Sequence, residues 1–236
     1  MTGSIVTADL RARVRGLAVP IARGFGRLGL SPNRLTLIGF GIALLAAGVA
    51  AGQLWVTAGI LVLVGGAFDL LDGALARATG RVNRLGAFMD SVFDRWGEGV
   101  IYVGIAFGCA EAGFAEGAIL ASAALASAVM VSYVRAKSEG LGFTPGTGMA
   151  SVGLAPREVR IVLLTAGLIL AGVGGGVAPA EFIVCGANVG GCPPSTPDFG
   201  AAALGWTLGL ITILATITTI QRILHVVSQS EGDSNS

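Results

Sequence analysis

Four carboxylates in one short stretch have a spacing that could do chemistry. Asp69 and Asp72 lie three residues apart, and Asp90 and Asp94 lie four apart. On a helix either spacing places both side chains on one face, one above the other. Two helix ends joined by a short turn would bring the pairs together, and four like charges repel one another unless a cation lies between them or some stay protonated. Carboxylate oxygens are the ligands that Mg²⁺ and Mn²⁺ prefer, so the stretch predicts a site for a hard divalent cation.

Small residues and one arginine are interleaved with these aspartates. Gly73 and Ala76 follow the first pair, and Gly86 comes one turn before the second pair. They would leave the helix surface beside the metal open to a flat or bulky ligand. Arg77 adds a fixed cation that suits phosphate. The whole stretch is D-x2-D-G-x2-A-R-x8-G-x3-D-x3-D, and charges that are merely solvated at helix ends would not need the glycines.

This pattern resembles the signature of the CDP-alcohol phosphotransferase family, with every fixed position present. The family transfers a phosphatidyl group from a CDP-linked lipid to an alcohol and releases CMP. The resemblance implies that CDP-diacylglycerol is the donor and that Asp94 is the general base. It implies one or two Mg²⁺ or Mn²⁺ ions on the four aspartates, Asp69, Asp72, Asp90 and Asp94. It also implies a donor site made by Pro32, Asn33, Arg34, Gly73, Ala76, Arg77, Asn83 and Gly86. Glu98, one turn beyond Asp94, is expected to pair with a nearby arginine rather than to bind metal.

A second group of basic residues lies further along the chain. Tyr133 and Lys137 are four residues apart and share a helix face, while Arg135 points elsewhere. Arg157 and Arg160 lie one turn apart at an expected helix N-terminus. Basic residues there oppose the helix dipole, and a bound phosphate would account for them, as would ordinary positive charges at a membrane surface.

Both segments resemble the branch of bacterial phosphatidylinositol-phosphate synthases. That resemblance implies inositol phosphate as the acceptor. It implies an acceptor phosphate site made by Tyr133, Arg135, Lys137, Arg157 and Arg160.

Composition indicates a membrane protein. The chain has 236 residues, 53% of them hydrophobic and 12% charged, and its mean hydropathy is +0.79. Soluble domains usually carry about 25% charged residues. Six apolar stretches are each near the length that crosses a bilayer. They are Leu35–Ala51, Val56–Leu75, Phe88–Cys109, Gly117–Val134, Val159–Val177 and Ala201–Val227. We therefore expect an all-α integral membrane protein with six transmembrane helices.

The ends of the chain differ from this core. Residues 8–30 combine an apolar stripe at helical spacing with five arginines, which predicts an amphipathic helix on the membrane surface; packing on protein is the alternative. We expect three parts: residues 1–30 as this interfacial helix, 31–228 as the six-helix catalytic domain, and 229–236 as a polar, disordered tail.

Charge placement predicts the orientation. With six crossings, all 15 basic residues fall on one side of the membrane. By the positive-inside rule the active site and both termini are cytoplasmic, in a multi-pass protein of the plasma membrane. The opposite side includes a long segment with Cys185 and Cys192, which could form a short disulfide or remain two reduced cysteines.

Other functions fit part of the pattern. Glycerol 3-phosphate is the alternative acceptor, which would make the chain a phosphatidylglycerophosphate synthase. A divalent-cation transporter would also need carboxylates, but transporter sites favour the bilayer midplane and broken helices, whereas here the charges crowd one edge. A scaffold with a decayed site is disfavoured because all four aspartates are intact. We expect a homodimer, as in relatives, and no nucleic-acid partner.

Overall fold

Seven helices and no strands make up the part of the chain that the structure, a computed structural model, describes: residues 8–143, 153–177 and 199–234. In chain order they are α1 (Ala8–Arg27), α2 (Pro32–Ala51), α3 (Trp55–Ala78), α4 (Arg84–Glu111), α5 (Ala115–Gly140), α6 (Arg157–Val173) and α8 (Phe199–Ser234). Ser31 caps α2 by accepting a hydrogen bond from the Arg34 backbone N–H, with Pro32 in the first turn, as the sequence at this break indicates.

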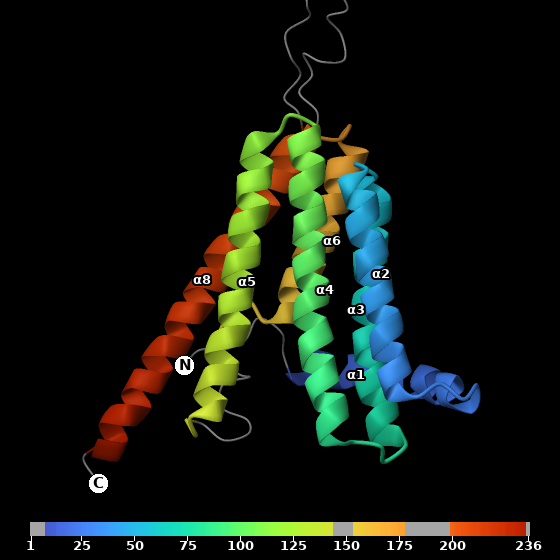
Figure 1. Ribbon diagram of the computed structural model, residues 1–236, viewed down its shortest axis with the longest axis vertical. Coiled ribbons are helices and arrows are strands. Elements are labelled where there is room, and N and C mark those ends of the chain that lie inside the picture. Colours follow the sequence, from blue (N-terminus) through green and yellow to red (C-terminus); the bar gives the residue numbers. More distant parts are fainter. Residues whose placement is uncertain (1–7, 144–152, 178–198, 235–236) are drawn as a thin grey trace, which may run out of the picture.

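Six of these helices form a closed ring, which Figure 1 shows from the side. α2 packs against α3 and α4, α5 against α4 and α8, and α6 against α3 and α8. α3 and α4 themselves are hardly in contact. The two helices that carry the aspartates are therefore neighbours with a gap between them, and α2 closes one side of that gap while the start of α6 closes the other.

Small residues let the ring close tightly on the side of α2 and α4. Gly104 and Gly108 of α4 lie against the backbone of Ala47 and Ala50 of α2, and a Cβ on either glycine would collide with a carbonyl oxygen. Such close approach of backbones is typical of helix pairs in lipid. It holds the C-terminal half of α4 in a fixed place relative to α2.

α1 lies across the foot of the ring, roughly perpendicular to the other helices (Figure 1). Its Ala18 and Ala22 are buried against Leu71 and Leu75 of α3. On the same helix Ile21 is half exposed. α1 therefore packs on protein through small residues and keeps apolar surface free for lipid. It combines the two structures considered for this segment, a helix on the membrane surface and a helix packed on protein.

The six predicted apolar stretches match the six ring helices to within a few residues, apart from the ends of α5 and α8. By length and composition, α2, α3, α5 and residues 199–230 of α8 are each able to cross a membrane. α4 carries five charged residues between Arg84 and Glu98, and α6 has 17 residues, which rise only about 25 Å. The count of six crossings thus stays a prediction. α4 and α6, the two ring helices that do not meet the criteria of length and composition, both contribute to the site described below.

Two predictions concern other segments. α8 continues to Ser234, so its backbone is helical through most of the stretch expected to be a disordered tail. The reason is that a helix already nucleated over several turns elongates at low cost even through polar residues. Cys185 and Cys192 lie outside the described residues.

Candidate active site

α3 and α4 bring the four aspartates to the same end of the ring. The turn between the helices is fixed by Asn83, whose Oδ1 accepts a hydrogen bond from the Gly86 N–H at 2.7 Å and so caps α4. Asp72 is buried, and its Oδ2 accepts a hydrogen bond of 2.6 Å from the Thr36 hydroxyl of α2. Both aspartate pairs therefore face the gap between α3 and α4.

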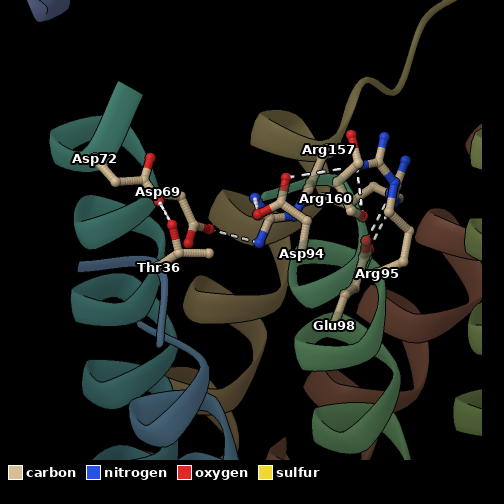
Figure 2. Close-up of polar contacts among 9 residues, drawn as sticks. Thr36, Asp69, Asp72, Asp94, Arg95, Glu98, Arg157 and Arg160 are labelled. Atoms are coloured by element: carbon tan, nitrogen blue, oxygen red, sulfur yellow. Dashed lines mark hydrogen bonds and ion pairs between the residues drawn. The ribbon is translucent and has the colours of Figure 1, made fainter. Parts of the chain in front are cut away.

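Arg157, the first residue of α6, reaches into this gap. Its guanidinium lies 2.6 Å from Asp69 Oδ2 and 3.0 Å from Asp94 Oδ1, so it joins α3 to α4 (Figure 2). The guanidinium keeps its positive charge, because arginine is not deprotonated in proteins and two carboxylates contact it here.

Whether the aspartates fit a metal can be judged from this arrangement. In the described part of the chain, no three carboxylate, histidine or cysteine side chains converge closely enough to hold an ion. The carboxylates instead surround a cation that the protein supplies, since Arg157 is shared by Asp69 and Asp94. The donor set is all oxygen and strongly negative, and it already accommodates a positive charge, so it fits a hard divalent cation in kind and in charge.

One cavity of about 320 Å³ lies on the side of the aspartates that faces α2. Most of the residues predicted to bind the CDP-lipid line it: Pro32, Asn33, Gly73, Ala76, Arg77, Asn83 and Gly86. Arg34 is not among the residues that line it. A Cβ on Gly86 would lie 3.3 Å from the Oδ1 atoms of both Asn33 and Asn83, so this glycine allows the two amides to come together.

A second cavity, of about 520 Å³, lies on the other side of the aspartates. Asp69, Asp90 and Asp94 line it, and Asp90 also lines the first cavity. The remaining walls carry arginines from four helices: Arg95 of α4, Arg135 of α5, Arg157 and Arg160 of α6, and Arg222 of α8. This cavity therefore brings five arginines together beside the carboxylates.

The structure groups the predicted acceptor residues differently from the sequence. Arg135, Arg157 and Arg160 line the second cavity, whereas Tyr133 and Lys137 do not and are exposed. Arg95 and Arg222 were not predicted. A signal for Arg222 was available, because a charged residue within the last apolar stretch is costly in lipid and is typical of a functional site.

Arg160 is also placed differently from expectation. Its side chain is 1% exposed, and its Nε and Nη2 atoms each donate a 2.7 Å hydrogen bond to the Glu98 carboxylate (Figure 2). The expectation that Glu98 pairs with an arginine is confirmed. As a phosphate ligand, Arg160 would first have to leave Glu98.

Two cavities thus flank one carboxylate cluster inside a ring of apolar helices. Residues 29–183 match the family described as CDP-alcohol phosphatidyltransferase. The chain belongs to this family and is an enzyme of its class, a transferase of phospholipid biosynthesis.

The named relatives are synthases of inositol phosphate lipids. The chain is 38% identical over 157 residues to an archaetidylinositol phosphate synthase from Pyrococcus horikoshii, covering 66% of this chain and 79% of that protein. It is 32% identical over 227 residues to a phosphatidylinositol phosphate synthase from Streptomyces avermitilis, covering 95% of this chain and 84% of that protein.

Solved structures of one protein are similar as well. The crystal structure of Mycobacterium tuberculosis phosphatidylinositol phosphate synthase with CDP-DAG bound matches with a TM-score of 0.68 at 25% identity, over 89% of this chain and 92% of that one. The same protein in complex with manganese and citrate matches with a TM-score of 0.68 at 26% identity, over 89% and 88%.

Proposed function

We propose that the chain transfers a phosphatidyl group from CDP-diacylglycerol to the hydroxyl of a phosphorylated polyol, inositol phosphate, and releases CMP. The observation that carries this proposal is the pair of cavities that share Asp90. Besides carboxylates, the first is lined mainly by small residues, two asparagines, Arg77 and Arg81, and the second carries five arginines among apolar residues. A nucleotide lipid and a soluble phosphorylated alcohol would thus meet from opposite sides of one carboxylate cluster.

The donor would lie in the first cavity. Gly73, Ala76 and Gly86 leave the backbone open there, and the amides of Asn33 and Asn83 are able to hydrogen-bond the cytosine or the ribose. Arg77 offers a planar cation to the pyrophosphate. Its guanidinium lies over Gly73, where a Cβ would be only 3.3 Å from the Arg77 Nη1 atom. The acyl chains would remain in the bilayer beside the ring.

The acceptor phosphate would bind in the second cavity, with Arg157 as its main ligand. Arg157 Nη1 and Nη2 contact the two aspartates, while its Nε is buried and has no hydrogen-bond partner among the described residues. Arg95 and Arg135 line the same walls and add positive charge. An alcohol held there would have its hydroxyl directed toward Asp94.

The reaction would then proceed by a single displacement. The acceptor hydroxyl oxygen attacks the phosphorus that carries diacylglycerol, its proton passes to the Asp94 carboxylate, and the bond between that phosphorus and the CMP oxygen breaks. A Mg²⁺ or Mn²⁺ ion on the aspartates would supply a Lewis acid that neutralises the pyrophosphate. Asp69, Asp72 and Asp90, with Asp94 beside them, are the residues that would hold it, and Thr36 orients Asp72.

We also propose six membrane crossings, with the active site and both termini on the cytoplasmic side of the plasma membrane. An even number of crossings would put both ends of the ring on one side, and the basic residues of the sequence would fall on that side. α6 would cross as a short helix that begins within the membrane's polar boundary, since Arg157 lies level with Asp94 rather than at the end of α4. A homodimer remains our expectation.

The test is CMP release by the purified protein with CDP-diacylglycerol and Mg²⁺. Inositol phosphate, glycerol 3-phosphate, serine and free inositol would be offered separately. Release with inositol phosphate alone supports the proposal, and release with glycerol 3-phosphate alone overturns the acceptor but keeps the mechanism. If no acceptor gives release and the protein instead conducts divalent cations in liposomes, the transferase proposal is wrong.

A further inference from the structure

A buried ion pair joins α4 to α6 one helical turn beyond Asp94. Glu98 is 7% exposed and Arg160 is 1% exposed, and the two side chains are held in a bidentate pair with both distances at 2.7 Å. Bidentate pairing of this kind fixes orientation as well as position. The mechanism proposed above makes no use of Glu98, so the pair needs another explanation.

The same arginine also binds the segment before α6. Its Nη1 donates a hydrogen bond of 3.0 Å to the Ala155 carbonyl oxygen. The Leu154 and Ala155 N–H groups in turn donate to the Thr218 hydroxyl of α8, at 3.1 Å and 3.0 Å. Thr218 is fully buried and donates its own hydrogen to the Leu214 carbonyl, so all of its hydrogen-bonding capacity is used. Gly153, with φ of +123°, packs directly on Thr218.

Pro156 occupies the N-cap position of α6 and provides no side-chain hydrogen bond. In the first turn Glu158 favours the helix dipole and Arg157 opposes it. Besides the ion pairs of Arg157 itself, the contacts of Glu98, Arg160 and Thr218 hold this turn in place. Arg157 is the first residue of the turn, so these contacts contribute to where its guanidinium lies.

We propose that Glu98, Arg160 and Thr218 are positioning residues that hold Arg157 for the acceptor phosphate. This inference rests on the proposed function, in which Arg157 is the main acceptor ligand. It gives Arg160 a role without direct contact to substrate, because its side chain is 1% exposed and each guanidinium nitrogen already donates a hydrogen bond inside the protein. Loss of these contacts would misplace Arg157 and weaken the acceptor site, while the donor cavity on the other side of the aspartates would be unaffected.

The experiment compares two neighbouring threonines of α8. Thr218→Val removes the acceptor for two backbone N–H groups at almost constant volume, whereas Thr219→Val removes only a hydroxyl that bonds the Ala215 carbonyl of its own helix. We expect Thr218→Val to raise KM for inositol phosphate at least tenfold and to leave KM for CDP-diacylglycerol within twofold. Thr219→Val and the conservative Thr218→Ser should leave both values near those of the wild type.

Glu98→Gln separates positioning from direct binding by Arg160. If Arg160 were a phosphate ligand restrained by Glu98, weakening the pair would lower the acceptor KM or leave it unchanged. Positioning predicts a rise, as in Thr218→Val. An acceptor KM that falls or stays unchanged in Glu98→Gln overturns the inference, and so do equal changes in donor and acceptor KM in Thr218→Val.

Amide hydrogen exchange tests the inference independently of activity. In the full-length protein, peptides that cover residues 153–160 should exchange faster in Thr218→Val than in the wild type, and Thr219→Val should not change them. Equal exchange in the two variants overturns the inference whether or not the wild type uses inositol phosphate. Absence of CMP release by the wild type, with the exchange difference intact, overturns the proposed function and leaves the structural role of Thr218 standing.

Discussion

The two cavities that flank the aspartates are built from different kinds of side chain. The first cavity, which we propose as the donor cavity, is lined by residues between Pro32 and Asp90, most of them small or amide-bearing. The second, which we propose as the acceptor cavity, is lined from five helices and carries five arginines. A large, partly neutral nucleotide needs room and a few directed hydrogen bonds, while a small dianion needs concentrated positive charge. The comparison teaches that substrate recognition would depend mainly on shape in the first cavity and mainly on electrostatics in the second. Asp90 and Asp94 lie between the two.

Substitution at Asp94 should have the largest effect, because we propose that its carboxylate takes the proton of the acceptor hydroxyl. We expect Asp94→Asn to lower kcat for CMP release by about a thousandfold, the scale of a lost general base. Donor binding, measured as retention of CDP-diacylglycerol in the purified protein, should be preserved. Activity within tenfold of the wild type would show that another group takes the proton.

Substitution at Arg157 should affect the binding of the acceptor and not that of the donor. A hydrogen-bonded ion pair to phosphate contributes enough that we expect Arg157→Gln to raise the acceptor KM about a hundredfold, with a small effect on the donor KM. Arg157 competes for Asp69 and Asp94, so Arg157→Gln should also bind Mn²⁺ more tightly in an electron paramagnetic resonance titration.

Arg157→Lys is the control for charge in that experiment. Lysine keeps the positive charge but lacks the planar fork, so it should restore part of the acceptor affinity and the weaker Mn²⁺ binding. If Arg157→Gln changes donor and acceptor KM equally, the two cavities are not separate substrate sites.

On the donor side, added volume should matter more than charge. Gly86→Ala would place a Cβ 3.3 Å from the Asn33 and Asn83 Oδ1 atoms, and we expect the donor KM to rise about tenfold through loss of one or two directed hydrogen bonds. Gly48→Ala, where a Cβ would meet nothing within 4 Å, is the matched control. The acceptor KM should stay constant in both variants, and a rise in Gly86→Ala would mean that the asparagines serve both substrates.

The difference between the cavities also decides how much the sequence could predict. Seven of the eight predicted donor residues line the donor cavity, because they lie on α2, α3 and α4 at offsets that helix periodicity and one capped turn convert directly into positions. The ring helices were predictable for the same reason, from the length of each apolar stretch.

The acceptor side depends on which distant helices meet. Arg222 lies 62 positions beyond Arg160 in the sequence, and only the packing of α8 on α5 and α6 brings it to the cavity. Local spacing grouped Tyr133 and Lys137 with the acceptor, but the rotation of α5 turns both away from the cavity. The pairing of Arg160 with Glu98 depends on tertiary packing in the same way.

The smallest predicted effect concerns the difference between basic residues that line the acceptor cavity and those that lie outside it. The experiment removes one charge of each kind. Arg222 lines the acceptor cavity and donates a 2.6 Å hydrogen bond to the Val131 carbonyl oxygen, so it acts on the phosphate mainly through its field. We expect Arg222→Gln to raise the acceptor KM about fivefold, the effect of one unit charge across a partly solvated cavity. Lys137→Gln removes the same charge from an exposed position outside the cavity, where water and salt screen it, and should change the acceptor KM less than about twofold. Measuring both at low ionic strength and again in 0.3 M salt sharpens the contrast, because a screened surface charge loses its influence while a buried one keeps it. A larger effect for Lys137→Gln than for Arg222→Gln would mean that the acceptor approaches along α5, as the sequence spacing indicates, rather than through the cavity of arginines.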